Sequence, residues 1–170
     1  MSMAKRAFHN PVVQALLLGL LLFTVSFAIR VLSNLIVGGF TAGPAPLEPI
    51  AEGQSVWRWV LDTVLLSVAL PALIETPFVV FPVRRADQER PSVALWIMVA
   101  VIAGFAWLFH GASPGALGQA AAFALMAYAA WGWSRRCGRW SYGLAILAHA
   151  VWNGSGLALY LPQRLPGLLG

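Results

Sequence analysis

Charge is scarce in this sequence. Asp, Glu, Lys and Arg together make up 10% of the 170 residues, whereas a typical soluble domain carries about 25%. Cys137 is the single cysteine, so an intramolecular disulfide and a cage of thiolate metal ligands are both excluded. The sequence also has no internal repeat and no low-complexity tract. These absences argue against a soluble globular domain, a disulfide-linked secreted fold and a repeat protein.

Apolar residues are abundant instead. They make up 59% of the chain, compared with about 45–50% in soluble proteins, and they fall into five long blocks at 11–38, 56–83, 92–110, 115–133 and 141–161. A membrane-spanning helix needs about 20 such residues. The first block continues past Ser26 and Ala28, which favours a retained helix over a cleaved signal peptide. The sequence therefore predicts an all-α fold: a single membrane domain over 1–170, built as a polytopic transmembrane helix bundle of about five spans.

The distribution of basic residues predicts an orientation. The net charge of +5 does not indicate a nucleic-acid-binding protein, because such a protein needs a contiguous basic surface and the basic residues here gather in short segments between apolar blocks. If the helices alternate in direction, one side of the membrane receives Lys5, Arg6, Arg84, Arg85, Arg90, Arg135, Arg136 and Arg139. The opposite loops and tail hold Arg164 with Glu48 and Glu52. Since cytoplasmic loops are enriched in Lys and Arg, we expect residues 1–10 in the cytoplasm and the tail at 162–170 outside.

Four polar side chains stand out inside the apolar blocks: Glu75, His110, His149 and Asn153. An ionisable group at mid-membrane costs about 2.5–3.5 kcal/mol on insertion scales, so such residues are retained for a structural or a functional reason. A lone histidine or asparagine in a membrane is most often a hydrogen-bonding residue between helices. Three ionisable groups together with an amide favour a site instead.

Glu75 and His149 are expected at similar depth in the membrane. Glu75 lies nine residues before Arg84, and His149 lies ten residues after Arg139. At 1.5 Å per residue these intervals are about 13 and 15 Å from the same basic boundary. Asn153 follows His149 by four residues and therefore shares its helix face.

The helix face that carries Glu75 is weakly polar. Thr63, Ser67, Pro71 and Glu75 recur at every fourth position, so we expect this face to be turned toward other helices instead of lipid. A carboxyl group sheltered there is a candidate general base near neutral pH.

His110 is harder to place beside Glu75. Counted from Pro91 along a straight helix it lies about 28 Å away, near the opposite membrane surface. Pro71, Pro77 and Pro82 can kink the second helix, which would bring the two residues closer together.

A glutamate on one helix, a histidine at a helix end and a His-x-x-x-Asn pair on a later helix resemble the CPBP family. These are intramembrane proteases related to the CAAX prenyl endopeptidases, also called the Abi family. The matching stretches are PALIET (Pro71–Thr76), FAWLFH (Phe105–His110) and HAVWN (His149–Asn153). The intervals, 35 residues from Glu75 to His110 and 39 from His110 to His149, are similar to the family core, which would cover about 60–158.

The resemblance implies an endopeptidase that hydrolyses a peptide bond of a membrane-associated peptide or lipidated protein, in the inner membrane of a bacterium. It implies that Glu75 activates a water molecule and that His110 and His149 orient this water or donate hydrogen bonds. Asn153 would supply an amide N–H to the oxyanion. Glu75, His110 and His149 could also serve as zinc ligands. We prefer a mechanism without metal, because zinc would leave the water without a separate base.

The motifs depart from the family pattern at three positions. Ile74 and Val79 stand where the family has a second glutamate and an arginine, and Ala106 stands where it has a phenylalanine. A catalytically degenerate relative, acting as a membrane scaffold or bacteriocin-immunity protein, is therefore an alternative. A b-type haem held by His110 and His149 is another.

Overall fold

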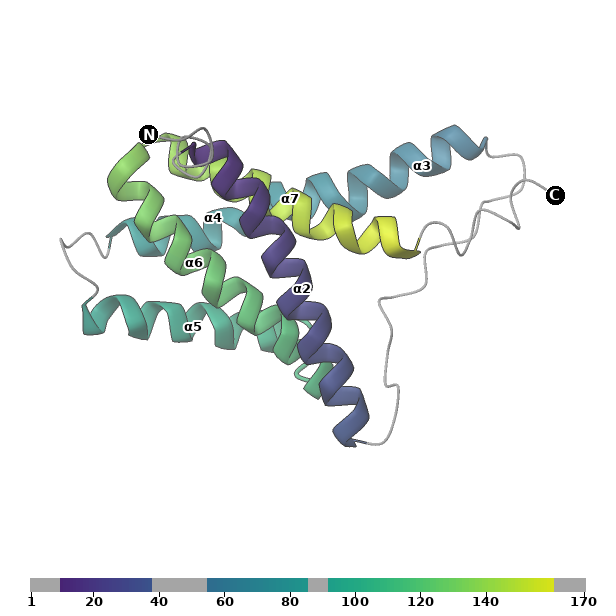
Figure 1. Cartoon of the computed structure of the whole chain (residues 1–170), viewed down its shortest axis with the longest axis horizontal. Coiled ribbons are helices and arrows are strands. Elements are labelled where there is room, and N and C mark those ends of the chain that lie inside the picture. The colour runs from purple at the N-terminus through teal and green to yellow at the C-terminus, as the bar shows by residue number, and fades with distance from the viewer. Residues whose placement is uncertain (1–9, 38–54, 86–91, 161–170) are drawn as a thin grey trace, which may run out of the picture.

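The computed structural model describes residues 10–37, 55–85 and 92–160, and this part of the chain is all-helical, with no strand among the described residues (Figure 1). In chain order its elements are α2 (Pro11–Val37), α3 (Val56–Val64), the π-helical turn η1 (Leu65–Ala69), α4 (Leu70–Arg85), α5 (Val93–Phe109), the 3-10 turn η2 (Pro114–Ala116), α6 (Leu117–Cys137) and α7 (Trp140–Tyr160). Because α3, η1 and α4 run on without a break, the described residues form five helical segments, one for each apolar block. The all-α prediction is confirmed, while the terminal segments predicted at 1–10 and 162–170 lie almost entirely outside the described residues.

Two of these segments are long and apolar enough to cross a membrane, judged by length and composition alone. They are α2, with 27 residues, and the continuous helix Val56–Arg85, with 30 residues. Helix α5 is apolar but shorter, at 17 residues. The number of spans, about five, therefore stays a prediction.

Polar side chains cap the helices where they begin. Asn10 Oδ1 accepts a hydrogen bond of 2.9 Å from Val12 N at the start of α2, and Pro11 occupies the first helical position, where its missing N–H costs nothing. Ser55, Ser92 and Ser113 accept equivalent bonds of 3.3 Å at the starts of α3, α5 and η2. Each cap satisfies a backbone N–H that has no partner within its helix, so the boundaries follow from the residues that precede the apolar blocks.

The π-helical turn η1 corrects the expected polar face around Glu75. Leu70 N donates to Leu65 O, five residues back, just before Pro71, which has no N–H to donate. A π turn inserts a residue into the helical register, so the four-residue spacing of Thr63, Ser67, Pro71 and Glu75 no longer defines one face. Ser67 is exposed, whereas Glu75 is half-buried.

Helix α2 lies against both α6 and α7, and α6 also packs on α4 and α5 (Figure 1). Two glycines of the described residues allow this close approach. A Cβ atom at Gly19 would lie 2.6 Å from the carbonyl oxygen of Ala148, and one at Gly118 would overlap the carbonyl oxygen of Ser26. Small residues therefore hold α2 in backbone contact with its two neighbours, as they do in many helix packings within membranes.

Helix α6 extends further than the apolar block that predicts it. The block ends at 133, but α6 continues through Arg135 and Arg136 to Cys137, and Gly138 then adopts a positive φ of 54°. Arginines near a helix C-terminus interact favourably with its free carbonyl groups, and Arg136 Nε donates to Gly132 O at 3.2 Å. The basic segment after the fourth block is thus the last turn of a helix, not a loop.

Candidate functional site

Glu75 and His149 lie side by side in the structure. Glu75 is in α4, His149 is in α7, and their Oε2 and Nε2 atoms are 3.7 Å apart. The His149 side chain is 1% exposed and the Glu75 side chain is 27% exposed. This contact agrees with the equal depths expected from the sequence. It places a buried imidazole next to a partly exposed carboxylate.

Thr76 fixes the orientation of the His149 ring. Its hydroxyl oxygen lies 3.2 Å from His149 Nδ1, and the Thr76 side chain is completely buried. With Nδ1 engaged by Thr76, Nε2 faces Glu75 in either ring tautomer. Thr76 belongs to the PALIET stretch, and its position next to the glutamate of an apolar block is the sequence signal that points to it.

Two aromatic residues enclose the His149 ring. Phe123 from α6 meets it edge-on with ring centroids 5.4 Å apart, and Trp152 from α7 stacks on it at 5.3 Å. Phe123 and Trp152 also contact one another at 5.3 Å. Neither was expected from the sequence, since aromatic residues are common throughout the chain. The two rings therefore pack against the imidazole, whose Nε2 faces Glu75.

Tyr142 joins the same two helices on the side of the basic residues. Its hydroxyl donates to the carbonyl oxygen of Leu73 at 3.3 Å. Tyr142 lies two turns before His149 in α7, and Leu73 lies two residues before Glu75 in α4. The bond therefore ties α4 to α7 close to the Glu75–His149 contact.

His110 lies closer to this pair than the count along straight helices suggested. It follows the last residue of α5 and is exposed, but its ring is 6.0 Å from that of Phe123. His110 and His149 therefore contact the same Phe123 ring.

The hydrogen bonding of His110 identifies which ring nitrogen is available. His110 Nδ1 lies 2.8 Å from the carbonyl oxygen of Ala106, and a carbonyl can only accept. Nδ1 is therefore the donor, and Nε2 of the neutral ring keeps its lone pair. Because Phe123 contacts the rings of both His110 and His149, a haem held by these two histidines would have to displace it.

Asn153 lies one turn after His149 on α7 and is half-buried. Its amide makes no hydrogen bond within the part of the chain that the structure describes. It shares the His149 face, as expected, but it does not contact Glu75 or either histidine through a hydrogen bond. Its N–H groups are therefore free to bind another molecule.

Gln119 is a further polar residue of this region that the sequence did not single out. Its Oε1 atom is buried and has no hydrogen-bond partner among the described residues. Gln119 lies one turn before Phe123 on α6, so the two share a helix face. An amide within an apolar block was the signal that could have identified it.

The zinc alternative needs three ligands close together. Within residues 10–37, 55–85 and 92–160, no three His, Cys, Asp or Glu side chains are grouped closely enough to hold a metal ion. Glu75 and His149 approach one another, but His110 does not complete a ligand set with them. Zinc binding by Glu75, His110 and His149 therefore stays a prediction.

Comparison of the chain with protein-family models, curated proteins and solved structures finds no match.

Proposed function

We propose that this chain is a multi-pass protein of the bacterial inner membrane with its N-terminus in the cytoplasm. Large apolar side chains are exposed on all five helical segments, for example Leu21, Phe78, Phe105, Leu125 and Leu159. Such a surface is rare on a soluble monomer and suits a hydrocarbon environment. The described arginines at 84, 85, 135, 136 and 139 follow the pattern of cytoplasmic positive charge.

We propose that the protein is an intramembrane endopeptidase that hydrolyses a peptide bond of a membrane-associated peptide or lipidated protein. The observation that carries this proposal is the Glu75–His149 contact of 3.7 Å, with Thr76 holding the other ring nitrogen. A partly exposed carboxylate next to an oriented imidazole is an arrangement that can serve in general base catalysis. Packing between helices alone does not require the carboxylate to be accessible.

The proposed reaction consumes one water molecule. Glu75 takes a proton from this water. At the same time the water oxygen forms a bond to the carbonyl carbon of the substrate. The carbonyl oxygen becomes an oxyanion, which an N–H of Asn153 stabilises, and removal of such a donor typically costs about 3–4 kcal/mol of transition-state stabilisation. The C–N bond then breaks and the proton passes from Glu75 to the leaving amine. His149 orients the water, and His110 Nε2 can accept one of its hydrogen bonds.

A survey of protein termini tests this proposal without a known substrate. Wild-type, Glu75→Gln and Asp62→Asn proteins are expressed in the same bacterial host, and mass spectrometry identifies new N-termini in its membrane fraction. Asp62→Asn is the matched control, because it removes one negative charge from an exposed site. We expect wild-type and Asp62→Asn proteins to produce a shared set of cleavage sites that Glu75→Gln does not produce.

A degenerate scaffold protein is the second candidate, and one observation favours it. Val79, which stands where the related family has an arginine, is 1% exposed and belongs to the hydrophobic core. The site therefore lacks the cation that the family pattern supplies at that position. An identical set of termini from wild-type and Glu75→Gln proteins would contradict the protease and support the scaffold.

A further inference from the structure

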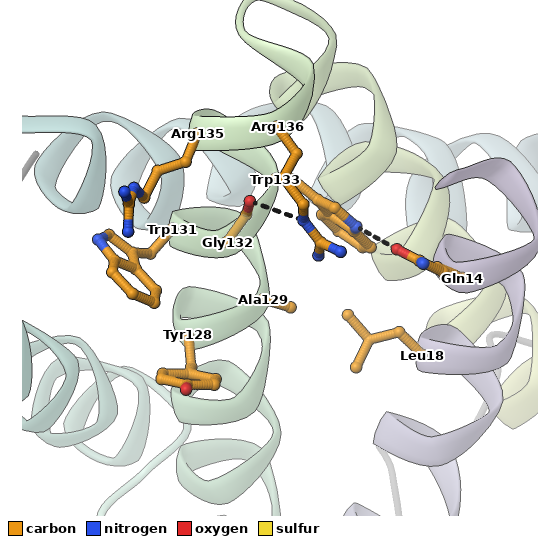
Figure 2. A pocket seen from close by; sticks show the side chains of 9 residues that line it. All are labelled: Gln14, Leu18, Tyr128, Ala129, Trp131, Gly132, Trp133, Arg135 and Arg136. Atoms are coloured by element: carbon orange, nitrogen blue, oxygen red, sulfur yellow. Dashed lines mark hydrogen bonds between the residues drawn. The ribbon is translucent and has the colours of Figure 1, made fainter. Parts of the chain in front are cut away.

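A second polar region lies near the C-terminal end of α6. Here the start of α2 packs against α6. It is a cavity of about 630 Å³ between these helices. Figure 2 shows Arg135 and Trp131 on one side of Gly132, and Arg136 and Trp133 on the other. Gly132 leaves the space open, because it has no side chain and a Cβ placed there would meet only Arg136, at 3.6 Å.

The walls of this cavity are rich in hydrogen-bond donors. The Arg135 guanidinium lies 5.3 Å from the centre of the Trp131 ring, in a cation–π contact. Arg136 uses Nε to bind Gly132 O, and its two terminal nitrogens have no hydrogen-bond partner among the described residues. None of the residues that line the cavity is Asp or Glu. The lining therefore contributes positive charge and no acidic side chain.

Trp131 adds a donor that is buried and unused. Its side chain is 7% exposed, and its Nε1 atom is buried without an acceptor among the described residues. In Figure 2 this nitrogen lies on the side of Arg135. Trp133, by contrast, donates to Gln14 Oε1 at 3.3 Å. Buried N–H groups nearly always have a partner, so the unused indole N–H indicates an acceptor other than the described residues.

We infer that this cavity binds the phosphate group of an anionic phospholipid. The inference rests on the membrane placement proposed above, and it does not depend on proteolysis. Arginine guanidinium groups bind phosphate oxygens through paired, charge-assisted hydrogen bonds. Basic pockets between helices on the cytoplasmic side are typical sites for anionic headgroups. Arg135 and Arg136 hold the phosphate above Gly132, and the Trp131 N–H donates to one of its oxygens.

The rest of the lining favours a lipid over a soluble phosphate. Leu18 and Ala129 extend the cavity along the two helices as an apolar surface, which an acyl chain can cover. Tyr128, Trp131 and Trp133 place aromatic rings next to the arginines, as at a membrane–water interface. A soluble phosphate compound would leave this apolar part uncovered.

Lipid retention by the purified full-length protein tests the inference. Wild-type protein in detergent is mixed with dioleoyl phosphatidylglycerol or with dioleoyl phosphatidylcholine, and native mass spectrometry counts the lipids that remain bound. Arg135→Gln/Arg136→Gln is compared with Arg84→Gln/Arg85→Gln, which removes the same charge from the end of α4, outside the cavity. Gly132→Leu fills the cavity without changing charge. Gel filtration confirms that each variant is folded.

We expect wild-type protein and Arg84→Gln/Arg85→Gln to retain phosphatidylglycerol at least fivefold better than phosphatidylcholine. Arg135→Gln/Arg136→Gln and Gly132→Leu should lose this preference. Excess glycerol 3-phosphate should not displace the lipid, and displacement by it would show that the site binds soluble phosphate compounds. Equal retention by both double arginine variants would overturn the inference. A protein that washes off membranes at alkaline pH would refute the membrane placement itself, which is a distinct result.

Discussion

The bundle contains two polar regions that differ in how their groups are satisfied. At the first, Glu75, His149 and Thr76 are each other's partners across α4 and α7. At the second, Arg136 and Trp131 carry donors without an acceptor among the described residues. The first region can therefore exist as a preorganised set of groups. The second has donors that the described residues do not satisfy, and we infer that an anion completes it.

Polar residues in an apolar chain can be sorted by whether they have a hydrogen-bond partner. Groups that satisfy one another contribute to stability as well as to chemistry, so their removal should affect both. Groups that have no partner make no stabilising hydrogen bond, so the loss of their polar atoms should mainly affect the binding of another molecule. Asn153 belongs to the second kind, although it lies next to the first region.

Glu75→Gln should have the largest effect. It keeps the size of the side chain but removes the base, so we expect the rate of peptide cleavage to fall about 10³-fold. The measurement is the cleavage rate of a peptide that contains a site found in the terminus survey, with protein in liposomes. Phosphatidylglycerol retention should not change, because Glu75 does not line the second region. Loss of both properties together would mean that the two regions are not independent.

Asn153→Ala should separate activity from stability. An oxyanion donor typically contributes 10²–10³-fold to the rate, so we expect cleavage to fall about 100-fold. The free energy of unfolding should change by less than about 0.5 kcal/mol, since no hydrogen bond among the described residues is lost. Thermal unfolding in detergent measures the stability. A large loss of stability with normal cleavage would assign Asn153 to helix packing instead.

Thr76→Val should affect both quantities modestly. Valine has nearly the same shape but cannot bond to His149 Nδ1, so the ring loses its fixed orientation. We expect a rate reduced about tenfold and an unfolding free energy lowered by about 1 kcal/mol. Thr24→Val is the control, because the Thr24 hydroxyl bonds only within its own helix, to Leu20 O. An unchanged rate in Thr76→Val would show that Thr76 does not position the imidazole.

Two tryptophan substitutions are expected to have the smallest effects on the free energy of unfolding. They compare an indole N–H that has an acceptor with one that has none among the described residues. Trp133→Phe removes the hydrogen bond to Gln14, whereas Trp131→Phe removes an N–H that has no acceptor. Both lose a similar ring volume, so the difference between them isolates the hydrogen bond. We expect Trp133→Phe to lower the free energy of unfolding by about 1 kcal/mol more than Trp131→Phe. Equal losses would mean that Trp131 Nε1 has a partner in the purified protein.

The sequence predicted the helices well because their signal is local. Five apolar blocks and the polar residues before them fix where helices begin, as the caps at Asn10, Ser55 and Ser92 show. The approach of Glu75 to His149 was also predictable, since both are counted from arginines at helix ends.

Other features could not be predicted from local patterns. The π turn before Pro71 changes the helix register through backbone hydrogen bonds, so the exposure of Ser67 was missed. The partnership of Thr76 with His149 joins residues 73 positions apart, and the approach of His110 depends on how whole helices tilt. The extension of α6 to Cys137 reflects arginines that stabilise a helix end, which the apolar pattern alone did not reveal.

The central claim is that the Glu75 carboxylate faces water inside a membrane protein. Cysteine labelling tests it directly. Cys137→Ser provides a background without thiols. Only a hydrated, ionised thiol reacts rapidly with a charged methanethiosulfonate reagent. Glu75→Cys and Phe78→Cys are compared in that background, in native membranes open on both sides. Phe78 is 73% exposed, far more than Glu75. We expect Glu75→Cys to be labelled and Phe78→Cys to be protected by lipid, whereas faster labelling of Phe78→Cys would contradict the claim.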